Sequence, residues 1–218
     1  MKIDSKARKI LESFPRSVRD FFSQISQKCQ KHGVKFRVSS YSVVYSGSGA
    51  CSGYFCDQRK ELAIAINNSL KWVLSTLVHE DSHFDQWLDE KSIWHDKQNR
   101  QNFDNFFDWL LKVKNIKDPT ESAKHVVRLE ADCERRSIKK IKKSWSKIIS
   151  PEVYAQNANA YMFSYLYMAK SRKWLSRNFG LSQKAFYKNF PEKILNKFDS
   201  LPRKYSELFK QKCKSGPK

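Results

Sequence analysis

The sequence predicts a mainly helical α+β protein of 218 residues, and three observations lead to this fold class. Short segments rich in β-branched and aromatic residues lie between positions 35 and 66, and glycines separate them. An uninterrupted helical pattern then runs from about 69 to 90, and apolar residues recur at helical spacing through the second half of the chain. We therefore expect a small sheet of three or so strands packed on the helix that follows it.

A single domain is expected over residues 1–218, because this length stays within reach of one hydrophobic core. Residues 1–33 are predicted to form helices interrupted at Pro15, and 34–150 to hold the sheet and two central helices. Residues 151–218 are predicted to be a helical extension that ends in a basic tail.

The second central helix has a clear start in the sequence. Asp118 is placed as N-cap, Pro119 stands at the first helical position, and Glu121 follows three residues after the cap. Apolar spacing predicts further helices over about 103–114 and 154–174.

Composition indicates a protein without a membrane segment. No stretch approaches the roughly 18 uninterrupted apolar residues that a spanning helix needs, and no secretory signal is visible, so we expect a cytoplasmic location. The cysteines are odd in number and scattered, which favours reduced thiols over disulfides. They are Cys29, Cys51, Cys56, Cys133 and Cys213.

The formal net charge of +20 is the strongest compositional signal. Such a charge attracts nucleic acid or another acidic partner at low salt. Lysines are spread along the whole chain, with local density at Arg135–Arg136 and over 139–143. The alternative is that these residues form an ordinary solvated helix face.

The segment from His79 to His83 reads HEDSH and matches the pattern H-E-x-x-H. Residues four apart lie on one face of a helix, so both imidazoles can bind one metal ion, with Glu80 beside it as general base. His83 falls about 40° from His79 around the helix, whereas the apolar residues cluster on the opposite side. The alternative is a pair of surface histidines near carboxylates.

A hydrolytic zinc site normally has three protein ligands, so a third ligand is required. The continuation H-x-x-G-x-x-H is absent, because Gln86 and Asp89 stand where Gly and His would be. Glu130 is the preferred candidate: it shares an otherwise apolar helix face with Glu134, and a buried carboxylate needs a cationic partner. Glu134 is the alternative ligand, or else a supporting hydrogen-bond partner of a histidine ligand. His95 and His125 are further candidates.

These residues resemble the zincin metallopeptidases in which a glutamate from a second helix completes the site. The likeness rests on HEDSH at 79–83 and EADCE at 130–134, preceded by the strand-like segments SGYFCD and LAIAIN. The arrangement is similar to minigluzincin-like domains and to candidate metallopeptidases of tailed phages, and it covers Val34 to Ser137. Many glutamate zincins carry E-x-x-x-D, whereas this chain has Glu134 at the last position.

The resemblance implies a zincin-like fold and a Zn²⁺-dependent hydrolysis of peptide bonds in a protein or peptide substrate. Glu80 would act as general base, and a tyrosine of the helix over 154–174 would donate to the developing oxyanion. Tyr161 is the first choice, with Tyr165, Tyr167 and His125 as alternatives. A phage-encoded protein of this kind would act in the host cytoplasm. The competing functions are a basic nucleic-acid-binding protein and a zinc-binding scaffold without turnover.

Overall fold

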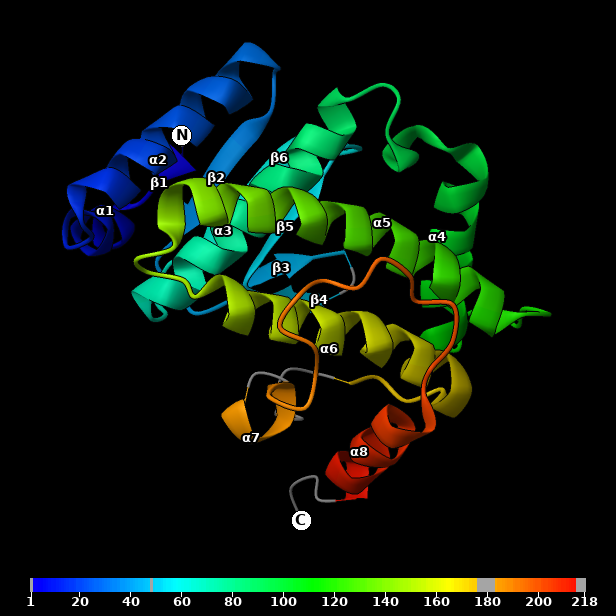
Figure 1. The fold of residues 1–218 in the computed structure, drawn as a ribbon. Coiled ribbons are helices and arrows are strands. Elements are labelled where there is room, and N and C mark those ends of the chain that lie inside the picture. Colours follow the sequence, from blue (N-terminus) through cyan, green and yellow to red (C-terminus); the bar gives the residue numbers. More distant parts are fainter. Residues whose placement is uncertain (1, 48, 176–182, 215–218) are drawn as a thin grey trace. The chain divides into compact units, whose positions relative to one another are not determined.

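The computed structural model describes residues 2–47, 49–175 and 183–214. Contacts between residues divide the chain into two compact units, Met1–Asp89 and Glu90–Lys218, and each is described by itself. The first unit contains all the strands of the described residues, whereas the second is built from helices (Figure 1). The predicted α+β class with mainly helical content is confirmed. The single domain stays a prediction, because a compact group of contacts need not fold alone.

The first unit is built on a four-stranded sheet in the order β1-β2-β6-β5. β1, β2 and β6 are mutually parallel, and β5 runs antiparallel to β6 at the edge. The strands are β1 (Lys2–Ile3), β2 (Lys35–Ser39), β5 (Gly53–Cys56) and β6 (Glu61–Ala65). A separate hairpin consists of β3 (Val44–Ser46) and β4 (Gly49–Cys51). The sequence did not predict β1 or β4, which have only two and three residues.

Three helices accompany this sheet. α1 (Ser5–Glu12) and α2 (Arg16–Lys31) are separated at Pro15, as predicted, and α2 packs against β2. α3 (Leu70–Leu88), the predicted motif helix, packs on β5 and β6. Its close approach requires glycine at position 53, because a Cβ there would lie 2.7 Å from the Thr76 methyl group. The β3–β4 hairpin contacts β6 on the face of the sheet opposite to α3. The buried side chains that pack together there are Val44, Tyr54, Ala63 and Ala65.

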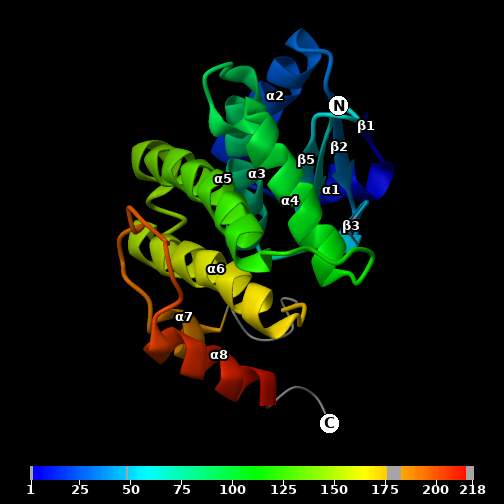
Figure 2. The same ribbon diagram turned by 90° about the vertical axis from the view of Figure 1, so that its right-hand side faces the viewer.

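The second unit is a layered group of helices. α4 (Lys97–Leu110) packs on α5 (Pro119–Lys140), and α5 lies side by side with α6 (Pro151–Ser171) (Figure 2). α7 (Lys184–Tyr187) and α8 (Arg203–Lys214) pack against α6 and complete one aromatic-rich core. The short helices η1 (Ile93–His95) and η2 (Ile141–Trp145) precede α4 and extend α5.

Helix boundaries in the second unit follow local capping. α5 begins as predicted, with the Asp118 carboxylate accepting a hydrogen bond from the Glu121 N–H at 2.9 Å. α4 begins at Lys97 rather than near 103, because the Asp96 carboxylate accepts from the backbone N–H groups of the first turn. It ends at Leu110 rather than near 114, since Lys112 has φ 64°. Part of the predicted basic tail, residues 215–218, lies outside the described residues.

Among the described helices, none combines the length and the apolar character that crossing a membrane requires.

Candidate metal centre

Local contacts of the first unit position α3 on the sheet. The Ser69 hydroxyl caps the helix by accepting from the Trp72 N–H, and the Trp72 indole N–H donates to the Ser52 hydroxyl at 2.9 Å. Phe84, fully buried, stacks on Phe55 of β5 with ring centroids 5.1 Å apart. These contacts fix both the rotation and the tilt of the helix that carries the H-E-x-x-H motif.

A cation from α2 holds the middle of α3. The Lys28 ammonium group donates to the Asp81 carboxylate at 2.6 Å and to the Asp85 carboxylate, and it lies 4.6 Å from the centre of the Phe84 ring. Burial alone would lower the pKa of Lys28, but the two carboxylates outweigh it and raise that pKa. Asp81, at a variable position of the H-E-x-x-H pattern, and Asp85 are thus structural ion-pair partners of Lys28.

The two motif histidines meet on α3. The ring centroids of His79 and His83 are 4.7 Å apart with the planes nearly perpendicular, and one nitrogen of each ring lies within 4.8 Å of the other. His83 is buried, and its Nδ1 lies 2.8 Å from Oε1 of Gln86. Because an amide oxygen accepts, this contact keeps the proton on Nδ1 and leaves the Nε2 lone pair as the metal-binding atom. Glu80, between the histidines in sequence, is also buried.

A stripe of buried polar residues follows one face of α5 in the second unit. Glu130, Cys133, Glu134 and Ser137 succeed one another at three- and four-residue spacing, and all four are buried. Their environment is apolar on either side, since Val127 and Ile141 continue the same face and are also buried. The predicted burial of two carboxylates on this helix is confirmed, and carboxylate and thiolate groups are both ligands that Zn²⁺ accepts.

Tyrosines of α6 face these carboxylates. The Tyr154 hydroxyl donates a hydrogen bond to Glu134. Burial is the main cause that raises the pKa of Tyr154 well above its ordinary value, and the negative charge of Glu134 is the second. The Tyr165 hydroxyl donates to the Tyr161 hydroxyl, and the pKa of Tyr165 is raised by burial, by Tyr161 and by Glu130. Tyr161 and Tyr165 are thus linked through their hydroxyl groups.

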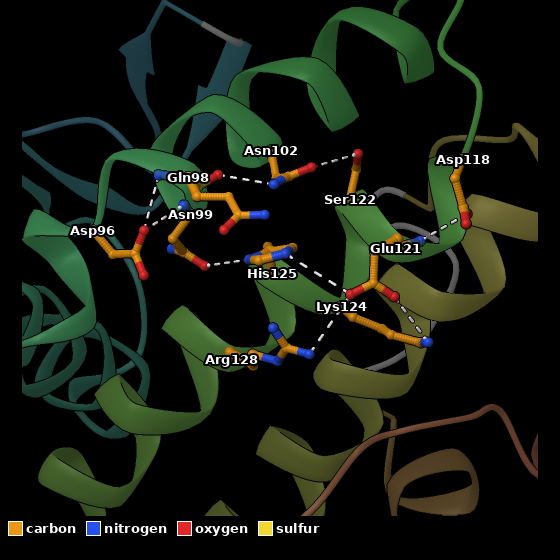
Figure 3. Close-up of polar contacts among 10 residues, drawn as sticks. All are labelled: Asp96, Gln98, Asn99, Asn102, Asp118, Glu121, Ser122, Lys124, His125 and Arg128. Carbon is orange, nitrogen blue, oxygen red and sulfur yellow. Dashed lines mark hydrogen bonds and ion pairs between the residues drawn. The ribbon is translucent and has the colours of Figure 1, made fainter.

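His125 lies in a different polar cluster, between α4 and α5 (Figure 3). Its Nδ1 lies 3.2 Å from the Asn99 side-chain oxygen, and its Nε2 lies 3.8 Å from the Glu121 carboxylate. Burial has the largest effect and lowers the pKa of His125, and the Arg128 guanidinium lowers it further. The Glu121 and Asp96 carboxylates oppose that shift. The imidazole thus joins the start of α4 to the first turns of α5 in its neutral form.

This lowered pKa predicts a pH-dependent stability. Unfolded histidine titrates near pH 6.5, so below that pH the unfolded chain binds more protons at His125 than the folded chain, and stability falls as the pH drops toward the folded pKa. The variant His125→Gln should lose less stability between pH 7.5 and 5, as measured by urea unfolding at both values. His32→Gln, in the first unit, controls for the loss of an imidazole. An unchanged pH dependence in His125→Gln would contradict the assignment.

The remaining sequence candidates occupy separate places. His95 is exposed in η1. Tyr167 is a core residue that stacks on Phe209 at 5.2 Å. The described cysteines Cys29, Cys51, Cys56 and Cys133 form no disulfide bond, and burial raises the pKa of Cys29 to about 12. The side chain of Cys213 lies outside the described residues.

Three functional candidates were missed in the sequence. Gln86 was considered only as a departure from the continuation H-x-x-G-x-x-H, although its spacing of three residues from His83 places it within reach on a helix. Tyr154 lies seven and eleven residues before Tyr161 and Tyr165, so the same periodicity places it on their face of α6. Cys133 was interpreted only as a reduced thiol, although it lies between two candidate carboxylate ligands.

No protein-family model matches this chain, and comparisons with curated proteins and with solved structures found no significant similarity.

Proposed function

We propose that this protein is a zinc-dependent peptidase with a zincin-like arrangement, in which His79 and His83 bind the metal and Glu80 is the general base. One observation carries the proposal: two imidazoles one turn apart on α3 have nitrogens within 4.8 Å, and one ring is held in a metal-binding tautomer by Gln86. A histidine ligand whose second nitrogen is hydrogen-bonded is typical of zinc sites.

The residues of the chain have distinct chemical roles in this proposal. His79 and His83 would hold a zinc ion, which would supply Lewis-acid activation of water at neutral pH. The Glu80 carboxylate takes a proton from the attacking water and returns it to the leaving amine. The position of Glu80 directly after His79 on α3 supports this role, because the H-E-x-x-H spacing puts the carboxylate beside a metal held by the histidines. Tyr161 is the proposed donor to the oxyanion.

We assign the third ligand to α5, and to Glu130 within it. The buried stripe of this helix offers Glu130, Cys133 and Glu134 as ligand-forming side chains. Glu134 already accepts the hydrogen bond from Tyr154, which suits a supporting role better than ligation. The Glu130 carboxylate, one turn earlier, adds to the effect of burial and of Tyr161 in raising the pKa of Tyr165. The ligand set His₂Glu, with two nitrogen donors and one carboxylate oxygen donor, is one that catalytic zinc sites use.

Metal analysis of the purified protein tests the histidines. We expect about one equivalent of zinc in protein prepared without a histidine tag or chelator, and loss of that zinc in His79→Ala and His83→Ala. Added zinc should also raise the melting temperature of the metal-free protein, but not that of either variant. His95→Ala is the control and should keep the metal. Metal-free native protein that zinc does not stabilise would refute the proposal.

Three conservative variants distinguish the candidate third ligands. Glu130→Gln should weaken zinc binding most. Glu134→Gln should weaken it less, because the loss of a side chain that only supports a ligand through a hydrogen bond lowers metal affinity by about 10- to 100-fold. Cys133→Ser should keep full affinity if Glu130 is the ligand. If Cys133→Ser lost the metal and Glu130→Gln kept it, the third ligand would be the Cys133 thiolate and not Glu130.

The proposed location is the cytoplasm, or the host cytoplasm if a phage encodes the protein. It is supported by the described cysteines, which form no disulfide bond, as is usual in reducing compartments.

A further inference from the structure

The positive charge of the chain is concentrated near its C-terminal end. Residues 135–218 contain 21 lysines and arginines but only four acidic residues, so they account for +17 of the net charge of +20. The acidic residues are Glu152, Glu192, Asp199 and Glu207. This imbalance is larger than a solvated surface needs for solubility, where a small domain carries a net charge of roughly 2–8.

Arg135 of α5 joins two segments that carry some of these lysines, namely the end of α5 and the loop between α7 and α8. Its guanidinium donates to the backbone carbonyls of Leu195 and Asn196 in the loop between α7 and α8, which Figures 1 and 2 show running past α6. Lys193 and Lys197 flank those carbonyls in sequence. Lys139 and Lys142 follow Arg135 by four and seven residues, so they lie on its side of the α5–η2 helix. We call Lys139, Lys142, Lys193 and Lys197 the basic face.

The loop that carries half of the basic face is rigidly held. Asn159 of α6 is fully buried, and its amide nitrogen donates to the carbonyls of Pro191 and Lys193, each at 2.9 Å. Its side-chain oxygen accepts from the Leu195 N–H at 3.1 Å. The backbone beneath Lys193 and Lys197 is therefore ordered before any partner arrives, which reduces the entropy lost on binding.

All four side chains of the basic face are exposed. Within the described part of the chain, none of them forms an ion pair. The pKa of the Glu152 carboxyl is lowered chiefly by the hydrogen bond from the Ser150 hydroxyl, and Lys142 adds only a smaller effect. Nearby basic residues that are neutralised differ from them: Arg136 pairs with Asp132 at 2.9 Å, and Lys210 pairs with Glu207 at 3.0 Å. The basic face thus presents uncompensated charge.

We propose that the basic face binds the phosphodiester backbone of nucleic acid without sequence preference, independently of the metal site. Phosphates are the densest regular array of negative charge that a row of lysines meets, and lysine contacts them as a point charge. A membrane fits less well, because interfacial helices need an exposed apolar side. No large hydrophobic side chain is exposed in 135–171 or 183–211, and the apolar residues Tyr205 and Phe209 of α8 are buried in the core.

Fluorescence anisotropy of the full-length protein with a labelled 20-base-pair DNA of arbitrary sequence tests this proposal. Affinity should fall steeply between 50 and 200 mM salt. The variant Lys139→Gln/Lys142→Gln/Lys193→Gln/Lys197→Gln should reduce the slope of log affinity against log salt by about 1 per lysine that contacts a phosphate, and so by about 3 to 4. The matched control removes the same charge from the first unit, at the exposed Lys6, Lys9, Lys31 and Lys71.

The control decides between a local site and a general effect of net charge. Binding that survives in the control but is lost in the basic-face variant supports the proposal. Equal loss in both variants would overturn it, and so would a salt-independent affinity. Polyglutamate or anionic vesicles that compete as well as DNA at equal charge would also overturn it, in favour of an acidic protein or a lipid surface. Circular dichroism and zinc content of both variants must match the native protein, which separates this test from that of the metal site.

Discussion

Replacement of Glu80 by glutamine is expected to slow peptide hydrolysis by about 10²–10⁴-fold while the zinc content stays at the native level. The amide keeps the size of the side chain, so the packing of this buried residue is preserved. It lacks the basicity needed to take a proton from water. The expected result is therefore a loss in kcat rather than in the stability of the fold.

Hydrolysis of labelled casein and zinc content should be measured on the same preparations. Glu12→Gln, an exposed residue of α1, is the matched control and should change neither value. If Glu80→Gln were as active as the native protein, another residue would have to be the base. If the native protein binds zinc but hydrolyses neither casein nor a mixture of peptides, the site is that of a zinc-binding scaffold without turnover.

Truncation of Asn159 to alanine is expected to destabilise the second unit by on the order of 3 kcal/mol. Its side chain satisfies three backbone groups of the loop between α7 and α8, and each buried polar group left without a partner costs about 1–3 kcal/mol. Water can reach part of this loop after the truncation, which keeps the sum near the lower end. For a chain of this length the melting temperature should fall by about 6–12 °C.

Thermal unfolding and amide hydrogen exchange measure this effect. Exchange at the Leu195 amide should accelerate in Asn159→Ala, because its acceptor is removed. Asn196→Ala is the control, since that exposed residue contributes only its backbone carbonyl to the contact with Arg135. A melting temperature that falls no further in Asn159→Ala than in the control would show that the loop is held by other contacts, such as those of Leu195 with the core.

Local signals predicted most of the secondary structure. Pro15 separates α1 from α2, and Asp118 with Pro119 starts α5, because capping and proline geometry act between residues close in sequence. Elements without such signals were missed. β1 and β4 are short and exist through their partners β2 and β3, and the polar first turn of α4 lacks the apolar spacing on which the prediction relied.

For the candidate site too, the sequence predicted some features and left others to the tertiary structure. The spacing of His79, Glu80 and His83 predicts a shared helix face, since helical periodicity depends on the chain alone. The same is true of the burial of Glu130 and Glu134 on α5, which the apolar pattern around them predicted. The tautomer imposed on His83 by Gln86 and the hydrogen bond from Tyr154 to Glu134 required coordinates, because side-chain rotamers and helix pairing select these partners.

The sequence by itself determined the fold class, the motif helix and the excess of positive charge. Only the tertiary structure decided which tyrosines of α6 face the carboxylates of α5, and that Asn159 and Arg135 hold the loop of the basic face. Capping and periodicity act over a few residues. These contacts instead join different helices and loops, 32 positions apart for Asn159 and Pro191 and 61 for Arg135 and Asn196, and they depend on how whole helices pack.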